Sequence, residues 1–275
     1  MGNKEQGEFW NGRMGSAWVS VEDYIDRMLE PISSEGIRLA AAKAGERVLD
    51  IGCGCGTTSL QLAADGAAVW GVDISENMIA RANEKDPGSA AVRFSVADAA
   101  VQKYTPDHDC AFSRFGIMFF DDPVVAFQNI RSGLKSDGRL VFLCWQAPAN
   151  NPWIAIAGQA VQPFMTEGAP QPGPTDPGPF AFADLDYTRK ILVEGGFTDI
   201  NIDPVEREIA LGSDLDELME FQSRVGPLSG LLDTLDENTA QKARQAVMDA
   251  FSQHLSDDGI VASAAAWLVS ARNSG

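Results

Sequence analysis

Short apolar runs alternate with stretches of helical periodicity along most of the chain. Apolar runs of this length, bounded by turn residues, are typical of buried strands. The predicted strands cover residues 48–51, 66–73, 91–99, 108–116, 139–145, 197–203 and 264–272. Because helical patterns separate most of these runs, we expect a doubly wound α/β domain with about seven mostly parallel strands and right-handed crossovers.

The helices are predicted from apolar residues three or four positions apart. From residue 20 a helix is expected to bend or break at Pro31, and a second piece should follow over residues 34–43. Further helices are predicted to start at or just after Thr57, Glu76, Asp122, Asp184, Ser213 and Thr239. The Pro- and Gly-rich residues 147–178 predict a long loop that contains one apolar segment, 151–165.

Composition narrows the classes of partner. The 275 residues carry a net charge of −18 with 45% hydrophobic residues, and the pI is about 4.4. Such acidity disfavours phosphate backbones and anionic membrane surfaces, and it agrees with high solubility or a saline interior. No secretory leader pattern and no apolar run near the roughly 20 residues of a membrane span occur, so a cytoplasmic protein without membrane insertion is expected.

Thiols and histidines provide weak candidates for chemistry. Cys53 and Cys55 supply at most half of a zinc site, so we expect free thiols and no metal. His108 starts a predicted strand, which would place it at the edge of the sheet away from a ligand. His254 follows a late helix and remains a minor candidate for a general base.

The stretch VLDIGCGCGTTSLQLA, residues 48–63, combines a strand, a glycine turn and a helix start. Gly52, Gly54 and Gly56 allow sharp turning and close approach of a ligand to bare backbone. The helix that begins at Thr57 offers free N–H groups and the positive end of its dipole. This stretch is therefore predicted to hold a polar small molecule.

Acidic residues end the next two predicted strands. Asp73 follows Gly52 by 21 residues, and a carboxylate there can accept both hydroxyls of a ribose. Asp98 ends the following strand. A nicotinamide or flavin site prefers G-x-G-x-x-G, whereas here the third glycine comes one residue early. The spacing thus favours another nucleoside-containing cofactor.

These motifs together resemble class I S-adenosylmethionine-dependent methyltransferases. VLDIGCGCGTT is similar to their first motif, GVDISENMIARA to the ribose-and-adenine segment, and FSVADAA to the adenine-edge segment. SRFGIMFFDDPVVAFQNIRSGLKSDGRLVF resembles the methyltransferase type 11 group, which includes ubiquinone and menaquinone C-methyltransferases. The resemblance runs from about residue 9 to residue 145, and its motifs are specific to the cofactor but to no substrate.

The resemblance implies a role for each matching residue in binding S-adenosylmethionine. The three glycines would lie under its methionine part, and both the Asp50 carboxylate and the Arg114 backbone carbonyl would lie near its ammonium group. The residues that would meet its ribose and adenine are Asp73, Ile74, Met78, Asp98 and Ala99.

Fewer residues in the sequence point to the binding of the methyl acceptor. Trp10 and Trp18 are candidates for a lid over the sulfonium, since a cation over an indole gains about 0.5–2 kcal/mol; anchoring the N-terminal helix is an equal alternative for them. Phe115, Trp153 and the helices over residues 215–255 should complete the pocket. No catalytic base is evident, which mildly favours an amine, thiol or pre-ionised acceptor.

The chain is accordingly expected to form one methyltransferase domain, residues 1–275. Its parts would be lid helices (1–45), a cofactor-binding half (46–146), a substrate-side loop and helix (147–183) and a helical insertion (212–258). The expected reaction is methyl transfer from S-adenosylmethionine to a small molecule, with S-adenosylhomocysteine as product. The alternatives are a non-methylating enzyme on the same cofactor and a cofactor sensor, and the oligomeric state is open.

Overall fold

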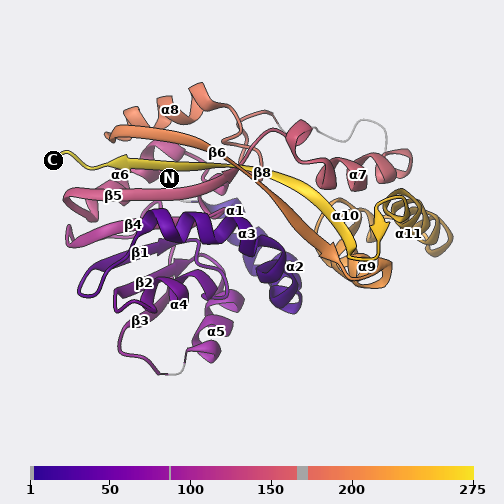
Figure 1. Cartoon of the computed structure of the whole chain (residues 1–275), viewed down its shortest axis with the longest axis horizontal. Helices are drawn as coiled ribbons and strands as arrows, with labels where there is room; N and C mark the ends of the chain where they lie inside the picture. Colours follow the sequence, from indigo (N-terminus) through magenta and orange to yellow (C-terminus); the bar gives the residue numbers. More distant parts are fainter. Residues whose placement is uncertain (1–2, 87, 166–172) are drawn as a thin grey trace.

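A single twisted sheet runs through the structure, a computed structural model that describes residues 3–86, 88–165 and 173–275 (Figure 1). Its strand order is β3-β2-β1-β4-β5-β8-β6, with β7 paired to β8 outside this path. The strands are β1 (Arg47–Ile51), β2 (Ala68–Asp73), β3 (Val92–Val96), β4 (His108–Arg114), β5 (Leu134–Trp145), β6 (Thr198–Gly212), β7 (Leu255–Ser256) and β8 (Gly259–Arg272).

Helices connect and cover these strands. They are α1 (Lys4–Asn11), α2 (Arg13–Ser20), α3 (Glu22–Ala40), α4 (Thr57–Ala63), α5 (Glu76–Lys85), α6 (Pro123–Ser132), α7 (Pro152–Val161), α8 (Leu185–Glu194), α9 (Leu215–Arg224), α10 (Pro227–Leu232) and α11 (Glu237–Ser252). Short 3₁₀ turns lie at Ile117–Phe119, Pro148–Asn150 and Gln162–Phe164.

The parallel half of the sheet has the doubly wound arrangement that the sequence predicts. β1 pairs in parallel with β2 and β4, β2 with β3, and β4 with β5. The chain winds outward from β1 to β3 and then returns to the other side of β1 with β4. The switch point between β1 and β4 is where an open α/β sheet leaves a crevice at the carboxyl ends of its strands.

The other half of the sheet is a long antiparallel hairpin. β8 lies between β5 and β6 and runs antiparallel to both. The predicted strands over residues 197–203 and 264–272 were too short, because β6 and β8 stay paired from Thr198↔Arg272 to Gly212↔Ile260. The far end of this hairpin carries α9 to α11 beside α7 (Figure 1). The insertion therefore consists of three helices, where the sequence predicted two.

The prediction that the N-terminal helix divides at Pro31, with a second piece over residues 34–43, is wrong. α3 is continuous across Pro31 and ends at Ala40. The C-cap residue of this helix, Ala41, has φ 45°. Its buried face, which includes Ile25 and Ile32, packs against the sheet, mainly against strands β6 and β5. This burial outweighs the lost backbone hydrogen bond at proline. Two further helices, α1 and α2, cover most of the first twenty residues.

Predicted helix caps agree with the structure at two places. The Asp122 carboxylate accepts from the Val125 N–H, and the Asp184 carboxylate accepts from the Tyr187 N–H. α11 begins earlier than predicted, because Asp236 caps it. In the predicted loop 147–178, the apolar segment forms α7, while residues 166–172 lie outside the described residues.

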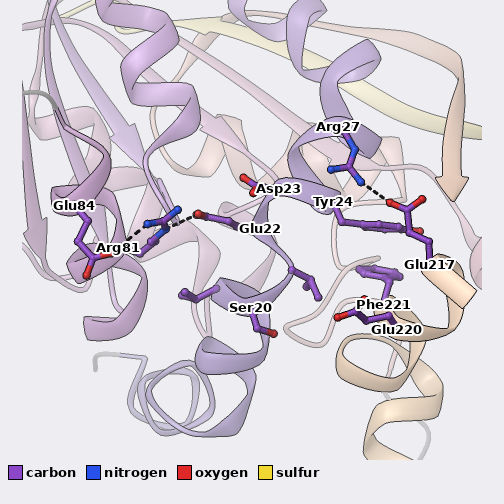
Figure 2. A pocket seen from close by; sticks show the side chains of 12 residues that line it. Ser20, Glu22, Asp23, Tyr24, Arg27, Arg81, Glu84, Glu217, Glu220 and Phe221 are labelled. Carbon is purple, nitrogen blue, oxygen red and sulfur yellow. Dashed lines mark hydrogen bonds and ion pairs between the residues drawn. The ribbon is translucent and has the colours of Figure 1, made fainter. Parts of the chain in front are cut away.

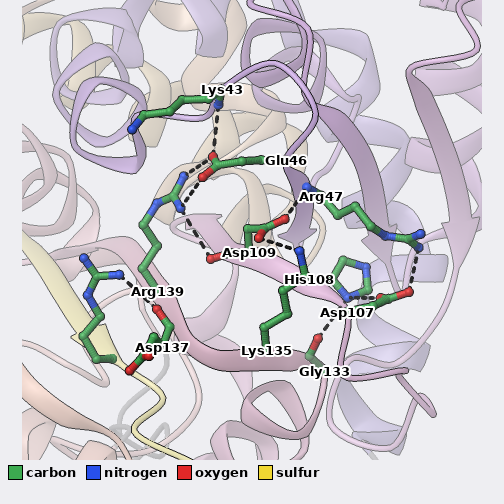
Figure 3. Close-up of polar contacts among 11 residues, drawn as sticks. Lys43, Glu46, Arg47, Asp107, His108, Asp109, Gly133, Lys135, Asp137 and Arg139 are labelled. Carbon is green, nitrogen blue, oxygen red and sulfur yellow. Dashed lines mark hydrogen bonds and ion pairs between the residues drawn. The ribbon is translucent and has the colours of Figure 1, made fainter.

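Ion pairs close the amino edge of the parallel strands (Figure 3). Arg139 binds Glu46 at 2.6 Å and donates to the Ala40 carbonyl at 2.6 Å. His108 lies at this edge, 1% exposed, with Nδ1 3.0 Å from the Gly133 carbonyl oxygen, and burial lowers its pKa. The structure thus places His108 away from the carboxyl ends of the strands, as the sequence indicated.

At the opposite edge, the turns that follow β1 and β4 are in direct backbone contact at Gly52 and Gly116. A Cβ on Gly116 would lie 2.8 Å from the Gly52 Cα and 2.8 Å from the Ile51 oxygen. A Cβ on Gly52, whose φ is 64°, would lie 2.7 Å from the Gly116 Cα. The two strand ends can approach this closely only because both residues are glycine.

We expect Gly116→Ala to destabilise the protein by about 1–3 kcal/mol, because its methyl group must push backbone atoms apart. Gly158→Ala in α7 is the matched control, since no atom lies within 4 Å of its added Cβ and alanine favours a helix. Urea unfolding of both variants checks this, and equal stability of the two would contradict the tight contact.

Candidate functional site

A cavity of about 600 Å³ opens at the carboxyl edge of the sheet, over the switch point. Its wall comes from α1 to α3, the turn after β1, the ends of β2, β4 and β5, the turn after β3, and the α7 and α9 segments. Cavities of this size and position are typical of small-molecule sites. The predicted site residues on its wall are Trp10, Trp18, Gly52, Gly54, Asp73, Ile74, Met78, Asp98, Ala99, Arg114, Phe115 and Trp153.

The three glycines of the turn serve different purposes. All have positive φ, 64° at Gly52, 54° at Gly54 and 83° at Gly56. The nearest atom to an added Cβ on Gly54 is the Met78 sulfur at 3.9 Å, so bare backbone borders the cavity there. A Cβ on Gly56 would instead lie 2.6 Å from the Phe94 ring. Gly56 therefore packs below the turn, off the cavity wall.

Asp73 is fixed by backbone N–H groups on both of its oxygens. Its Oδ2 accepts from Gly54 N–H at 2.9 Å, and its Oδ1 accepts from Ser75 N–H at 2.8 Å. Burial raises the pKa of this carboxyl although these bonds oppose the rise. Each carboxylate oxygen can accept a second bond, so Asp73 keeps capacity for a ligand in the cavity.

Asp98 is held by a residue that the sequence reading missed. Its Oδ2 accepts from the Asn3 backbone N–H at 2.9 Å, and its Oδ1 accepts from the Asn3 side-chain amide at 2.8 Å. Asn3 is 7% exposed, and its own Oδ1 accepts from Asp121 N–H at 2.9 Å. An asparagine just before the α1 helix was the available signal, but its partner, 95 residues away, could not be read from the sequence.

Asp50 does not lie on the cavity wall. It is fully buried, and its Oδ2 accepts from the Thr58 hydroxyl at 2.8 Å and the Ser59 hydroxyl at 2.6 Å. Its Oδ1 has no hydrogen-bond partner in the described structure, and burial raises the pKa of this carboxyl to about 6. Asp50 therefore lies under the turn, where its hydrogen bonds tie β1 to α4. It has no direct contact with the cavity.

Arg114 brings a charged network to the wall that was not predicted. Its guanidinium binds Asp26 at 2.9 Å, and the other Asp26 oxygen accepts from the Thr57 hydroxyl at 2.5 Å. Lys85 donates to the same hydroxyl at 2.7 Å. Glu22, 5% exposed, pairs with Arg81 nearby. Only α3, folded against the turn, brings these charges together.

Aromatic rings form two groups on the cavity wall. Trp10 meets Trp18 edge-to-face at 5.6 Å and Phe119 at 5.3 Å. Phe115, with φ 61°, stacks on Trp145 at 4.1 Å and 13°, and Trp145 meets Trp153 edge-to-face at 5.6 Å. Phe119 and Trp145 were missed because their places on the wall depend on the fold around them.

The insertion contributes to the wall through α9 and the turn after it. Phe221, Gln222 and Val225 line the cavity, as do Gly226 and Pro227. α11 and the exposed His254 do not, so neither histidine of the chain borders the cavity. The expectation that helices from residue 215 to 255 complete the pocket is met by their first part only.

A second, open pocket of about 530 Å³ lies on the outer side of α3 (Figure 2). Its charged groups pair with one another, Arg27 with Glu217 at 2.5 Å and Arg81 with Glu84 at 3.2 Å. Glu22 and Phe221 border both this pocket and the main cavity. We assign no ligand to this open pocket.

All four cysteines are unpaired and buried. Cys53 and Cys55 border the cavity, and burial raises the pKa of each thiol, which keeps it neutral. Within the described residues, no three His, Cys, Asp or Glu side chains gather as metal ligands would. In the same part of the chain, no helix combines the length and apolar character needed to cross a membrane.

Known proteins share this fold and part of this sequence. Residues 49–142 match the family model described as Methyltransferase domain. Demethylmenaquinone methyltransferase of Clavibacter sepedonicus is 35% identical over 112 residues, which are 40% of this chain and 46% of that protein. Phosphoethanolamine N-methyltransferase 1 of Zea mays is 38% identical over 124 residues, 44% of this chain and 25% of that protein. The match thus spans less than half the length of either relative.

Among solved structures, Haemonchus contortus phosphoethanolamine N-methyltransferase 2 in complex with phosphomonomethylethanolamine and S-adenosylhomocysteine is similar. The TM-score is 0.52 at 20% identity, over 88% of this chain and 52% of that one. This likeness shows the shared Rossmann-like fold and confirms the fold class predicted from the sequence.

The buried Asp50 predicts a specific pH dependence of stability. Its pKa is about 6 in the native state against an ordinary value of 3.8, so between these values the native state binds more protons than the unfolded chain. Its contribution to stability is then largest below about pH 4 and falls by about 3 kcal/mol up to about pH 7.

The variant Asp50→Asn lacks this titration and keeps an oxygen that can accept from Thr58 and Ser59. Urea unfolding between pH 4 and pH 7 should show that the free energy of unfolding of the wild-type protein falls, relative to that of the variant, as the pH rises. A constant difference over that range would contradict the raised pKa.

Proposed function

We propose that this chain, whose residues 49–142 match the family model described as Methyltransferase domain, is an S-adenosylmethionine-dependent methyltransferase that acts on a small molecule. The observation that carries the proposal is one cavity with two unlike ends. The glycine turn, Asp73 and Asp98 form a polar end, and stacked aromatic rings form an apolar end. Together these ends suit a nucleoside-containing donor placed beside an acceptor.

The residues at the polar end of the cavity fit the parts of S-adenosylmethionine. Gly54 leaves open space over bare backbone, which the methionine part would occupy. Asp73 keeps free acceptor capacity for the two ribose hydroxyls, and Ile74 and Met78 lie beside it on the wall, where they would flank the adenine. Asp98 and the Ala99 N–H would meet the edge of the adenine.

Two sequence-based roles are refined by the geometry. The Arg114 backbone carbonyl would still accept from the ammonium group of the cofactor. The guanidinium of Arg114 is paired with Asp26 instead. Asp50 acts indirectly, because it fixes the start of α4 through Thr58 and Ser59 and so shapes the turn.

When bound, S-adenosylmethionine supplies an already activated methyl group on a sulfonium. The chain's own contribution is then to position the acceptor and to exclude water. Trp10 and Trp18 provide aromatic surface for a cation at the N-terminal side of the cavity. Neither histidine borders the cavity, so no strong general base is assigned to it.

The surroundings of the site support a small-molecule acceptor. A net charge of −18 repels the phosphate backbone of nucleic acids. Four unpaired cysteines agree with the reducing conditions of the cytoplasm, where we place the protein. The sheet that joins both halves supports treating residues 1–275 as one domain.

Replacing Asp73 with Ala should weaken the binding of S-adenosylhomocysteine about 10- to 100-fold, the usual loss for hydrogen bonds to a charged group. Asp65→Ala, at an exposed position outside the cavity wall, is the matched control and should bind normally. Isothermal titration calorimetry measures both. Unchanged affinity of the Asp73 variant would mean that the cofactor site is wrongly placed.

Methyl transfer itself is tested with S-adenosylmethionine that carries a deuterated methyl group, incubated with fractionated metabolite extract. Mass spectrometry should find a labelled small molecule together with an equal amount of S-adenosylhomocysteine. Binding of the cofactor without labelled product in any fraction would instead support a sensor. Consumption of the cofactor without S-adenosylhomocysteine would support a non-methylating enzyme.

A further inference from the structure

The wall of the cavity changes character from one end to the other. The part that comes from the parallel strands and α3 carries the charged residues Glu22, Asp26, Asp73, Asp98 and Arg114. The part supplied by α7, residues 179–180 and residues 221–227 carries no charged side chain among the described residues. A ligand group buried against this second part meets almost only aromatic and aliphatic surface.

Gln222 is the exception on this uncharged part of the wall. It is 3% exposed, and its Oε1 has no hydrogen-bond partner among the described residues. The other polar side chain there, Trp153, already donates to the Asn151 Oδ1 at 3.4 Å. Leaving a buried carbonyl oxygen unpaired is unfavourable, because its lost hydrogen bond to water is not replaced. A donor on a bound molecule would remove this cost.

A glycine borders the Gln222 oxygen. Gly226 lies four residues after Gln222, beyond the end of α9. It has φ 105° and also borders the cavity. A Cβ on Gly226 would lie 3.3 Å from the Gln222 Oε1, so a larger residue at this position would crowd the oxygen.

Three aromatic rings in mutual contact also border the cavity. Phe115 and Trp145 stack in parallel, and Trp153 stands against Trp145 at 68°. Offset or edge-to-face packing against a further ring is favourable beyond the burial of apolar area alone. A planar ring system uses this surface better than a flexible chain does.

We propose that the acceptor is an uncharged, planar aromatic molecule whose hydroxyl or N–H group donates a hydrogen bond to Gln222. This inference rests on the proposed function, since it names the substrate class of the same cavity. Gln222 acts as a positioning residue, because an amide side chain cannot take up the acceptor's proton at neutral pH. Phosphorylated acceptors are excluded, because the only cation bordering the cavity, in the described residues, is Arg114, which is already paired with Asp26.

Three probes separate the features of this acceptor: 2-naphthol, naphthalene and 2-naphthyl phosphate. Binding is measured by quenching of tryptophan fluorescence, with and without saturating S-adenosylhomocysteine. Wild-type protein should bind 2-naphthol at least about 10-fold more tightly than the phosphate, because an unpaired buried charge is costly. Equal or tighter binding of the phosphate would overturn the proposal.

The variant Gln222→Leu tests the hydrogen bond. Its affinity for 2-naphthol should fall about 5-fold, the value of one ordinary hydrogen bond, while its affinity for naphthalene stays within about 2-fold. Gln222→Met repeats the test with a different apolar shape, and Gln241→Leu, at an exposed position of α11, is the control. A loss that is equal for 2-naphthol and naphthalene would reveal a purely structural role and overturn the assignment.

The cofactor titration keeps the two proposals apart. If S-adenosylhomocysteine fails to bind while the preference for 2-naphthol and its dependence on Gln222 persist, the methyltransferase proposal fails and the ligand class stands. If S-adenosylhomocysteine binds and that preference is absent, only the ligand class is wrong.

Discussion

The contact between Gly52 and Gly116 is the constraint on which the site depends. It joins the ends of β1 and β4 backbone to backbone, at the point where the winding of the sheet reverses. Because no side chain stands between them, the turn after β1 and the turn after β4 border one cavity. Phe115, next to Gly116, reaches the wall with a positive φ that this turn imposes. A larger residue at either glycine would separate the two turns.

Buried charge is arranged around this contact in an orderly way. Below the turn, burial raises the pKa of Asp50, although the hydrogen bonds from the Thr58 and Ser59 hydroxyls oppose the rise. On the wall, Arg114 and Asp26 neutralise each other, and Asp73 is held by backbone N–H groups. The far end, lined by α7 and α9, has no charge among its described residues. One cavity thus offers a polar donor end and an apolar acceptor end.

The N-terminal segment completes the enclosure and links its parts. Asn3 binds Asp98 and Asp121 at one side, and the Trp10 carbonyl accepts from the Ser75 hydroxyl at the other. These bonds hold α1 and α2 across the ends of β2 and β3.

The sequence by itself determined the α/β class, most strand positions, the glycine turn and the acids at the strand ends, because local periodicity and turn chemistry encode them. Twelve of the fourteen predicted site residues border the cavity; the exceptions are Asp50 and Gly56. Only the tertiary structure decided the unbroken α3, the full length of β6 and β8, and the partners Asn3, Asp26, Trp145 and Gln222. These depend on contacts between segments far apart in the chain, and no local pattern specifies which distant residue a side chain will meet.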